Sequence, residues 1–255
     1  MRSMGDSMTT RSGGASGPQG WADAAVAPWS RQAGRSALWV GIGFLLLVLV
    51  LQVVRTDLDW VQSQLSAYLH GAYGLLLRTA YCLLALAIAW LASGLQAALA
   101  PPVRSATVVG LFWMAGVGLS AVAIGDSWMP QLAPAAAPMV HQLAAQTAFL
   151  CVIAAVLLQS CYFHRDPRWR RHARAAICLG VLAFGALLLH ATTQALPRGL
   201  GQKIAIVLIV AWLTRAGAWL AAAERRAVCA TTATQPGPVT ADAGADVQSP
   251  QADAA

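Results

Sequence analysis

The chain has 255 residues, of which 58% are hydrophobic and only 11% are charged, and its mean hydropathy is +0.58. Soluble domains carry about a quarter charged residues, so this composition excludes an ordinary soluble domain and indicates a membrane protein. A net charge of +7 would suggest nucleic-acid binding in a soluble protein, but cytoplasmic loops of membrane proteins collect Lys and Arg, so we expect the lipid bilayer and no nucleic acid as a partner.

The first segment of the chain is polar and leads into a long apolar run. Residues 1–36 are rich in Ser, Gly, Ala, Thr and Arg without a helical period, which is typical of a disordered tail. Residues 37–54 meet the length of roughly 20 apolar residues that crosses the hydrocarbon core. We interpret this run as an uncleaved anchor, because its polar lead is too long for a signal peptide and no small-residue cleavage site follows.

The segment that follows, residues 57–74 (DLDWVQSQLSAYLHGAYG), has a helical pattern of its own. Its apolar residues recur at steps of three and four, with Asp, Gln and Ser on the other face. This pattern predicts an amphipathic helix at the outer membrane surface, with Trp60 and Tyr68 at headgroup depth. The apolar positions are Leu58, Val61, Leu65, Leu69 and Ala72.

Five further apolar runs predict five more spans, followed by an Ala/Thr/Pro/Asp-rich tail at 224–255 that we interpret as disordered. The third span carries Gly110, Gly116 and Gly118, and the fourth carries Ala144 and Ala148, small residues that let helices approach closely in lipid. The predicted fold is therefore all-α, a polytopic transmembrane bundle of six helices over residues 37–223. The five runs cover about 73–100, 106–125, 139–159, 175–194 and 204–223.

The arginines give the orientation of the bundle. With six spans, both tails and two of the loops lie on one side, and this side carries twelve Arg residues against Arg55, Arg198 and Lys203 on the other. The positive-inside rule predicts that both termini are cytoplasmic, in the plasma membrane (the bacterial inner membrane). The loop after the fourth span could also contact anionic lipid headgroups through Arg165, Arg168, Arg170, Arg171 and Arg174.

This threading gathers scarce polar groups at the outer membrane face. Ser66 and His70 precede the second span, Asp126 follows the third, His141 begins the fourth and His190 lies near the end of the fifth. Ionisable groups at membrane depth are costly, so these residues form the candidate site. Each also has an ordinary structural explanation, such as a histidine that bonds to a neighbouring helix or an aspartate that caps a helix.

The cluster is compatible with three kinds of chemistry. Ser66 and His70 would share a helix face, and Asp126 could orient the imidazole as in a hydrolase triad, although no nucleophile-elbow glycines surround Ser66. His70, Asp126, His141 and His190 are ligand types that zinc uses, and a metal-bound water could hydrolyse a lipid bond, although no HExxH pattern is present. Alternatively, the cluster binds a lipid headgroup or relays protons in a small carrier.

The five cysteines add no further site, because they form no CxxC pair and fall in spans or on the predicted inner side. We expect them to be small apolar fillers and not disulfides or metal ligands. The residues are Cys82, Cys151, Cys161, Cys178 and Cys229.

Three segments resemble the bacterial integral membrane family catalogued as domain of unknown function 998. The Ser-x-Tyr…Gly opening and second span of the family are similar to LSAYLHGAYGLLLRTAYCLLALAIAWLASGL. Its acidic loop and fourth span are similar to DSWMP…VHQLAAQTAFLCVIAAVLL, and its Gly-x-x-Gln-Arg start of the last span is similar to GLGQKIAIVLIVAWL. The resemblance covers about residues 37–223 and implies six helices in a membrane, with no activity assigned. Its polar signature falls on Ser66, Tyr68, Gly71, Asp126, His141 and Gln202.

Two positions depart from the family pattern. Lys203 stands where arginine is usual, so a bidentate role is not expected there. Pro130 follows Asp126, whereas the family tends to place proline before the acidic residue. The sequence thus predicts an integral membrane protein of unassigned function with an outer-face polar site, and it leaves a lipid hydrolase and a carrier or lipid-binding protein as alternatives.

Overall fold

The computed structural model describes residues 27–193 and 196–233, with the side chains of Asp126 and of 224–233 excepted. Within these residues the chain forms six long α-helices and two short 3₁₀ helices, and no strand. Each long helix contains a stretch long and apolar enough to cross a membrane, which confirms the predicted all-α fold and the six spans. The elements are α1 (Pro28–Val54), η1 (Leu65–Leu69), α2 (Gly74–Ala98), η2 (Pro101–Val103), α3 (Ala106–Leu132), α4 (Ala137–Arg165), α5 (Arg170–Thr192) and α6 (Arg198–Ala233).

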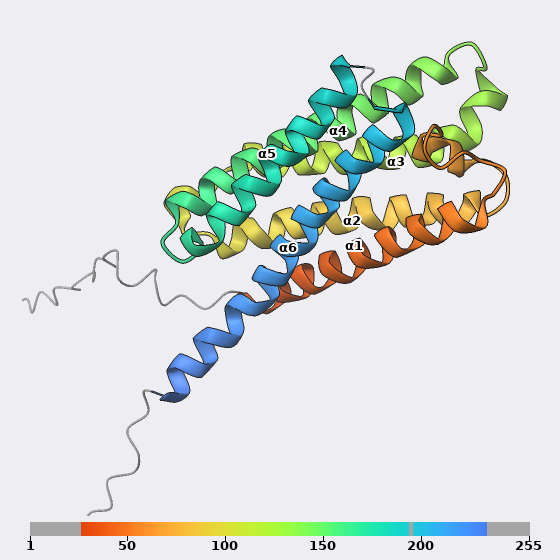
Figure 1. The fold of residues 1–255 in the computed structure, drawn as a ribbon. Coiled ribbons are helices and arrows are strands. Elements are labelled where there is room, and N and C mark those ends of the chain that lie inside the picture. The colour runs from red at the N-terminus through yellow and green to blue at the C-terminus, as the bar shows by residue number, and fades with distance from the viewer. Residues whose placement is uncertain (1–26, 194–195, 234–255) are drawn as a thin grey trace, which may run out of the picture.

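The six long helices form a closed ring. Each packs against the next in the chain, and α6 packs against α1, so the first and last helices complete the bundle (Figure 1). In addition, α6 touches α2 and α4. The apolar window of α6 is 61% buried, whereas that of α5 is only 17% buried. Of the six helices, α6 is therefore the most central and α5 the most peripheral.

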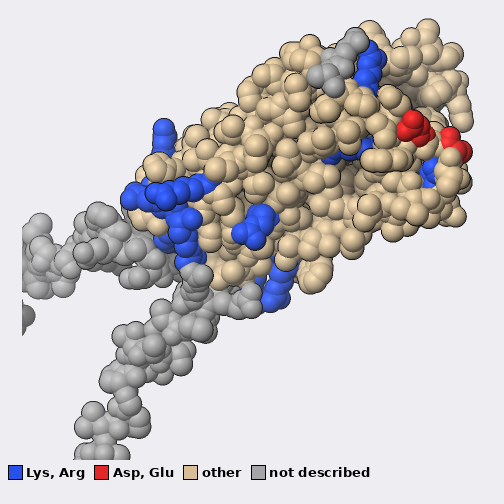
Figure 2. Space-filling model, in the orientation of Figure 1, with Lys and Arg blue, Asp and Glu red and all other residues tan. Residues whose placement is uncertain are grey.

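The two ends of the bundle differ in charge. Figure 2 shows Lys and Arg side chains gathered at the end where α1 begins, which we call the basic end. The Asp side chains visible on this face lie at the opposite end, where α1 leads into α2. That connection, residues 55–73, is called the strap below, and its end of the bundle is the strap end. The predicted separation of charge between the two sides is thus present along the bundle axis.

Small residues set the helix contacts, as the sequence predicts for most of them. A Cβ at Gly118 would lie 2.8 Å from the Ala144 carbonyl oxygen and 2.8 Å from the Ala148 nitrogen, so α3 and α4 touch through their backbones. A Cβ at Gly116 would lie 3.0 Å from the Ala85 carbonyl oxygen of α2. Gly110 is an exception, because a Cβ there would meet open space.

The helices are longer than hydropathy predicts. α1 begins at Pro28, so residues 28–36 are helical and not part of a disordered tail. α3 continues through Pro130 to Leu132, where the sequence predicted a loop, and α6 continues to Ala233. Hydropathy marks only the hydrocarbon-crossing part of a helix, and backbone hydrogen bonding can continue beyond it. Residues 224–233, predicted as part of the C-terminal tail, are therefore also helical, and the rest of the tails predicted at 1–36 and 224–255, residues 1–26 and 234–255, lies outside the described residues.

The strap is not the amphipathic α-helix that the sequence predicts. Its only helical turn is η1, and Gly71 and Tyr73 have φ of +73° and +65°, which ends regular helix. Leu65 and Leu69 are buried, and Tyr68 is also buried (1% exposed), so this tyrosine faces the inside of the bundle and not the lipid headgroups. The helical pattern is misleading here because Ser63 donates to its fourth neighbour, the Asp59 carbonyl, but other backbone groups of the strap bond to distant side chains.

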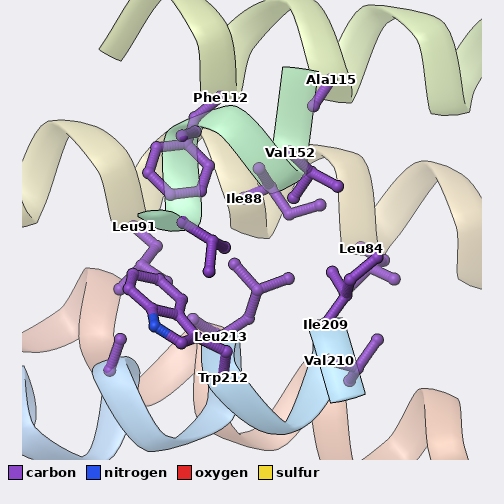
Figure 3. Close-up of a cluster of buried hydrophobic side chains, with 14 of the residues drawn as sticks. Leu84, Ile88, Leu91, Phe112, Ala115, Val152, Ile209, Val210, Trp212 and Leu213 are labelled. Atoms are coloured by element: carbon purple, nitrogen blue, oxygen red, sulfur yellow. The ribbon is translucent and has the colours of Figure 1, made fainter. Parts of the chain in front are cut away.

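The middle of the bundle is closed towards the basic end by stacked aromatic rings. Phe112 stacks on Trp212 with ring centroids 6.0 Å apart, and Phe163 stacks on Trp212 at 6.2 Å. The Trp212 indole N–H donates to Ser160 Oγ and to the Ala176 carbonyl, each at 3.1 Å. Figure 3 shows Phe112 and Trp212 among the aliphatic side chains of this core. Because the buried indole N–H is satisfied, the ring is fixed in place.

The basic end contains a buried carboxylate that the sequence did not reveal. Asp166, between α4 and α5, is 1% exposed. Its carboxylate accepts the Ala100 N–H at 3.0 Å and the Arg168 N–H at 2.9 Å, and the Arg168 guanidinium lies 3.6 Å away. Asp166 therefore ties the α4–α5 connection to the α2–α3 connection.

Candidate functional site

Arg55 holds the strap from the end of α1. Its Nε and Nη2 donate to the two carboxylate oxygens of Asp57, both at 2.7 Å, and its Nη1 donates to the carbonyls of His70 at 2.7 Å and Ala72 at 2.9 Å. The hydrogen bond between the two side chains raises the pKa of Arg55 and lowers the pKa of Asp57. Gly71 lies between the two carbonyls with a positive φ, which glycine adopts without strain.

The first residues of α6 hold the strap from the other side. Gln202 Oε1 accepts the Leu65 N–H at 2.8 Å, and the Leu200 N–H donates to the Val61 carbonyl at 2.9 Å. Lys203 Nζ donates to the Trp60 carbonyl at 2.6 Å. The strap is thus bonded at both its edges to helices that are far apart in the sequence.

Tyr68 lies between the two cations that hold the strap. Its ring centroid is 5.9 Å from the Arg55 guanidinium carbon and 5.2 Å from Lys203 Nζ, within the range of cation–π attraction. Its hydroxyl is buried and has no hydrogen-bond partner among the described residues. Burial raises the pKa of Tyr68, so the hydroxyl stays neutral. The signature positions Tyr68, Gly71 and Gln202 therefore belong to the attachment of the strap.

A polar pocket opens at the strap end. It has a volume of about 420 Å³ and is lined by Ser66 and His70 from the strap and by His141 from α4. These are three of the five residues that the sequence predicts to form one site. Ser66 and His141 are half-buried, and His70 is exposed. The remaining lining residues are Gln64, Ala67, Pro130, Ala137 and Pro138.

A second, narrower cavity lies deeper in the bundle. Its volume is about 80 Å³, and Ser66 and His141 line it as well as the polar pocket. The other residues around it are almost all apolar and come from α1, α2, α3, α4 and α6. Figure 3 shows part of this lining, with Leu84 and Ile88 of α2, Val152 of α4 and Ile209 of α6. The polar pocket and the apolar cavity therefore border on the same two side chains, Ser66 and His141.

Of the other two predicted site residues, His190 is not brought into this pocket, and Asp126 is described only by its backbone. His190 lines neither the polar pocket nor the apolar cavity, and no other described residue of the peripheral helix α5 lines either of them. It packs instead on α6, where a Cβ at Gly201 would lie 3.1 Å from His190 Nδ1. Asp126 belongs to α3, four residues after the cavity-lining Val122, and its side chain lies outside the described part of the structure.

The structure gives no direct support for a metal centre. Among the side chains that are described, no group of three His, Cys, Asp or Glu residues could hold a metal ion. The zinc hypothesis included Asp126, whose side chain is not among them, so zinc binding stays a prediction.

Two residues of the site were missed by sequence reasoning, although one carried a signal. Arg55 was counted only as one of few basic residues on the outer side, and Asp57 only as part of a polar helix face. A lone arginine immediately after an apolar span on the side that lacks basic residues contradicts the positive-inside bias. Such an arginine needs a local partner, and the acidic residue two positions later supplies it.

Comparison with known protein families identifies a match. A family model described as "Protein of unknown function (DUF998)" matches residues 38–220, which contain the four inner spans in full and most of the first and last ones. Neither a curated protein nor a solved structure matches the chain.

Proposed function

The chain belongs to the DUF998 family of proteins of unknown function, and its six span-length helices mark it as a multi-pass membrane protein; on this premise we propose that it binds an amphipathic lipid at the strap end. The headgroup would occupy the polar pocket, and the apolar part would enter the bundle. One observation carries this proposal: Ser66 and His141 line both the polar pocket and the apolar cavity beneath it. A site with this division of polarity suits a ligand that is polar at one end and apolar at the other.

The polar pocket favours an anionic or hydroxylated headgroup. Gln64, Ser66, His70 and His141 can all donate hydrogen bonds, and none of the described residues that line the pocket is acidic. Phosphate and hydroxyl oxygens are acceptors that such donors bind well, whereas a cationic group would find no counter-charge among these residues.

The proposal also assigns the two ends to the two sides of the membrane. The arginine bias supports a cytoplasmic basic end with both termini, so the pocket would face the outer side of the plasma membrane, which is the inner membrane of a bacterium. The basic end would contact anionic headgroups of the cytoplasmic leaflet, through arginines such as Arg165 and Arg171.

Lipid retention tests the proposal. The purified protein is equilibrated with a mixed polar lipid extract, and the bound lipid is identified and counted by native mass spectrometry. We expect His141→Leu to reduce the bound lipid at least several-fold, because it removes a donor shared by both spaces. His164→Leu, which replaces an exposed histidine near the end of α4, is the matched control and should retain the wild-type amount. Equal retention by the two variants would refute the proposal.

A second candidate, hydrolysis of a lipid ester, is favoured by the meeting of Ser66, His70 and His141 at one pocket. Ser66 Oγ would attack the ester with a histidine as general base, or a metal-bound water would take the place of the serine. Ser66→Ala should then abolish the release of fatty acid from a labelled phospholipid. For the metal-dependent form, zinc is measured in the wild type, His141→Ala and His190→Ala; equal and negligible zinc in all three would end the zinc hypothesis.

A further inference from the structure

We propose that the lipid bound at this site carries a single hydrocarbon chain, which lies in the apolar cavity and is about as long as one leaflet of the bilayer is thick. This inference rests on the proposed lipid binding and adds the class of the ligand. It depends on the depth, the floor and the width of the cavity.

The depth of the cavity corresponds to half a membrane. On α4 the lining residues run from His141 to Val152, and on α6 they run from Gln202 to Leu213. Both intervals are eleven residues, which at 1.5 Å per residue is about 16 Å. The hydrocarbon core of a bilayer is about 30 Å thick, so the cavity reaches roughly to its midplane. A chain bound there would end at the same depth as the chains of the surrounding outer leaflet.

The floor of the cavity is closed. Ala115 of α3 and Leu213 of α6 are among its deepest lining residues, and Phe112 and Trp212 lie directly beyond them towards the basic end. Both rings are fully buried, and the indole is held by two hydrogen bonds (Figure 3). A ligand that enters from the strap end therefore stops at this layer, which favours a binding site over a path through the membrane.

The width of the cavity admits one chain. A cavity volume of about 80 Å³ is enough for roughly five to eight water molecules. Distributed over a depth of about 16 Å, these molecules would lie one behind another, so the cavity is as wide as a single file. Its polar lining residues are Ser66, His141 and Gln202 near the mouth and Tyr81 seven residues into α2, and beyond Tyr81 the lining side chains are apolar, so the deepest part offers water no side-chain partners. Apolar cavities of this kind stay dry or take up an apolar guest. A second chain on the same headgroup finds no room in this file, and the closed ring of helices separates it from the surrounding lipids.

Photo-crosslinking distinguishes one chain from two. The full-length protein is placed in nanodiscs with lysophosphatidylglycerol or with phosphatidylglycerol, each carrying a diazirine near the end of one acyl chain. After illumination, the labelled residues are mapped by mass spectrometry. We expect the single-chain lipid to label the deep lining, near Ile88, Val152 and Leu213, at least tenfold more than the two-chain lipid does.

A variant that fills the cavity provides the control. Ala145→Trp places an indole in the cavity lining and should abolish the deep labelling, whereas Leu150→Trp, at a 64% exposed position on the same helix, should leave it unchanged. If Ala145→Trp lowers the thermal stability of the protein, Leu119→Trp fills the same cavity from α3.

The outcomes separate the two proposals. Deep labelling by both lipids that Ala145→Trp blocks would overturn the single-chain inference and leave lipid binding intact. Labelling confined to exposed residues for both lipids, and unaffected by Ala145→Trp, would overturn lipid binding itself. Deep labelling by the single-chain lipid that the filled variant does not block would overturn the assignment of the chain to this cavity.

Discussion

Replacing Arg55 with methionine should release the strap without unfolding the bundle. The substitution keeps much of the apolar stem but removes the two hydrogen bonds from Nη1 to the carbonyls of His70 and Ala72. Hydrogen bonds from a charged donor contribute about 1.5–3 kcal/mol each, and both carbonyls can bond to water once the strap opens, so we take the lower value for each. The expected loss is about 3 kcal/mol in the free energy of strap opening. The ion pair with Asp57 adds little to this, because the carboxylate side chain is 62% exposed.

Amide hydrogen exchange measures this loss directly. Since 1.4 kcal/mol is a factor of ten, strap amides such as Leu65 and Ala67 should exchange about 100-fold faster in Arg55→Met. Arg104→Met is the matched control, because Arg104 also donates to two carbonyls, those of Leu99 and Ala97, but at the basic end. It should leave strap exchange unchanged. Unchanged strap protection in Arg55→Met, or faster exchange spread evenly over α4 and α5, would refute the reasoning.

Three further predictions concern the ion pair of Arg55 with Asp57, the buried Asp166 and the indole of Trp212. Arg55 lowers the pKa of Asp57 from its ordinary 3.8, so the ion pair stabilises the strap above that pH and is lost as the pH falls through the lowered value. Amide hydrogen exchange in the strap, corrected for intrinsic rates, should therefore rise over that pH range in the wild type but not in Asp57→Asn. Asp166→Ala should destabilise the basic end by about 3 kcal/mol, because it leaves the half-buried N–H groups of Ala100 and Arg168 without their acceptor and removes the carboxylate beside the Arg168 guanidinium. The thermal unfolding temperature should fall well below that of Arg170→Ala. Trp212→Phe keeps a stacked ring but loses both indole hydrogen bonds, so thermal unfolding in detergent should show a loss of about 1–2 kcal/mol, and no loss would contradict the assigned role of the indole.

The spans and their arrangement could be predicted because they depend on properties that act along the chain. Apolar length determines which segments can cross a bilayer, and this identified all six helices. Small residues in the third and fourth spans predicted that helices approach closely there, and Gly118 of α3 does lie against the backbone of Ala144 and Ala148 of α4. Threading placed Ser66 and His70 of the strap at the same end of the bundle as His141 of α4, and all three line the polar pocket.

What could not be predicted depends on contacts between distant residues. The strap has the period of a helix, but its backbone is bonded by Arg55, Gln202 and Lys203, and nothing within residues 57–74 encodes those partners. His190 is at the predicted end of the bundle but on a helix that does not reach the centre. Sequence order places a residue along the membrane normal, whereas its position around the helix ring depends on packing.

The attachment of the strap to α6 has a consequence for how the protein matures. Gln202 and Lys203 follow their strap partners by 137 and 143 residues, so the connection after the first helix is made early in synthesis but can be fastened only when the last helix has entered the membrane. Until then, the strap that lines the pocket is unfastened on its α6 side, and the α6 wall of the apolar cavity is missing. A chain that stops after α5 would retain five span-length helices but lack this wall, so lipid capture at the proposed site would require the insertion of α6.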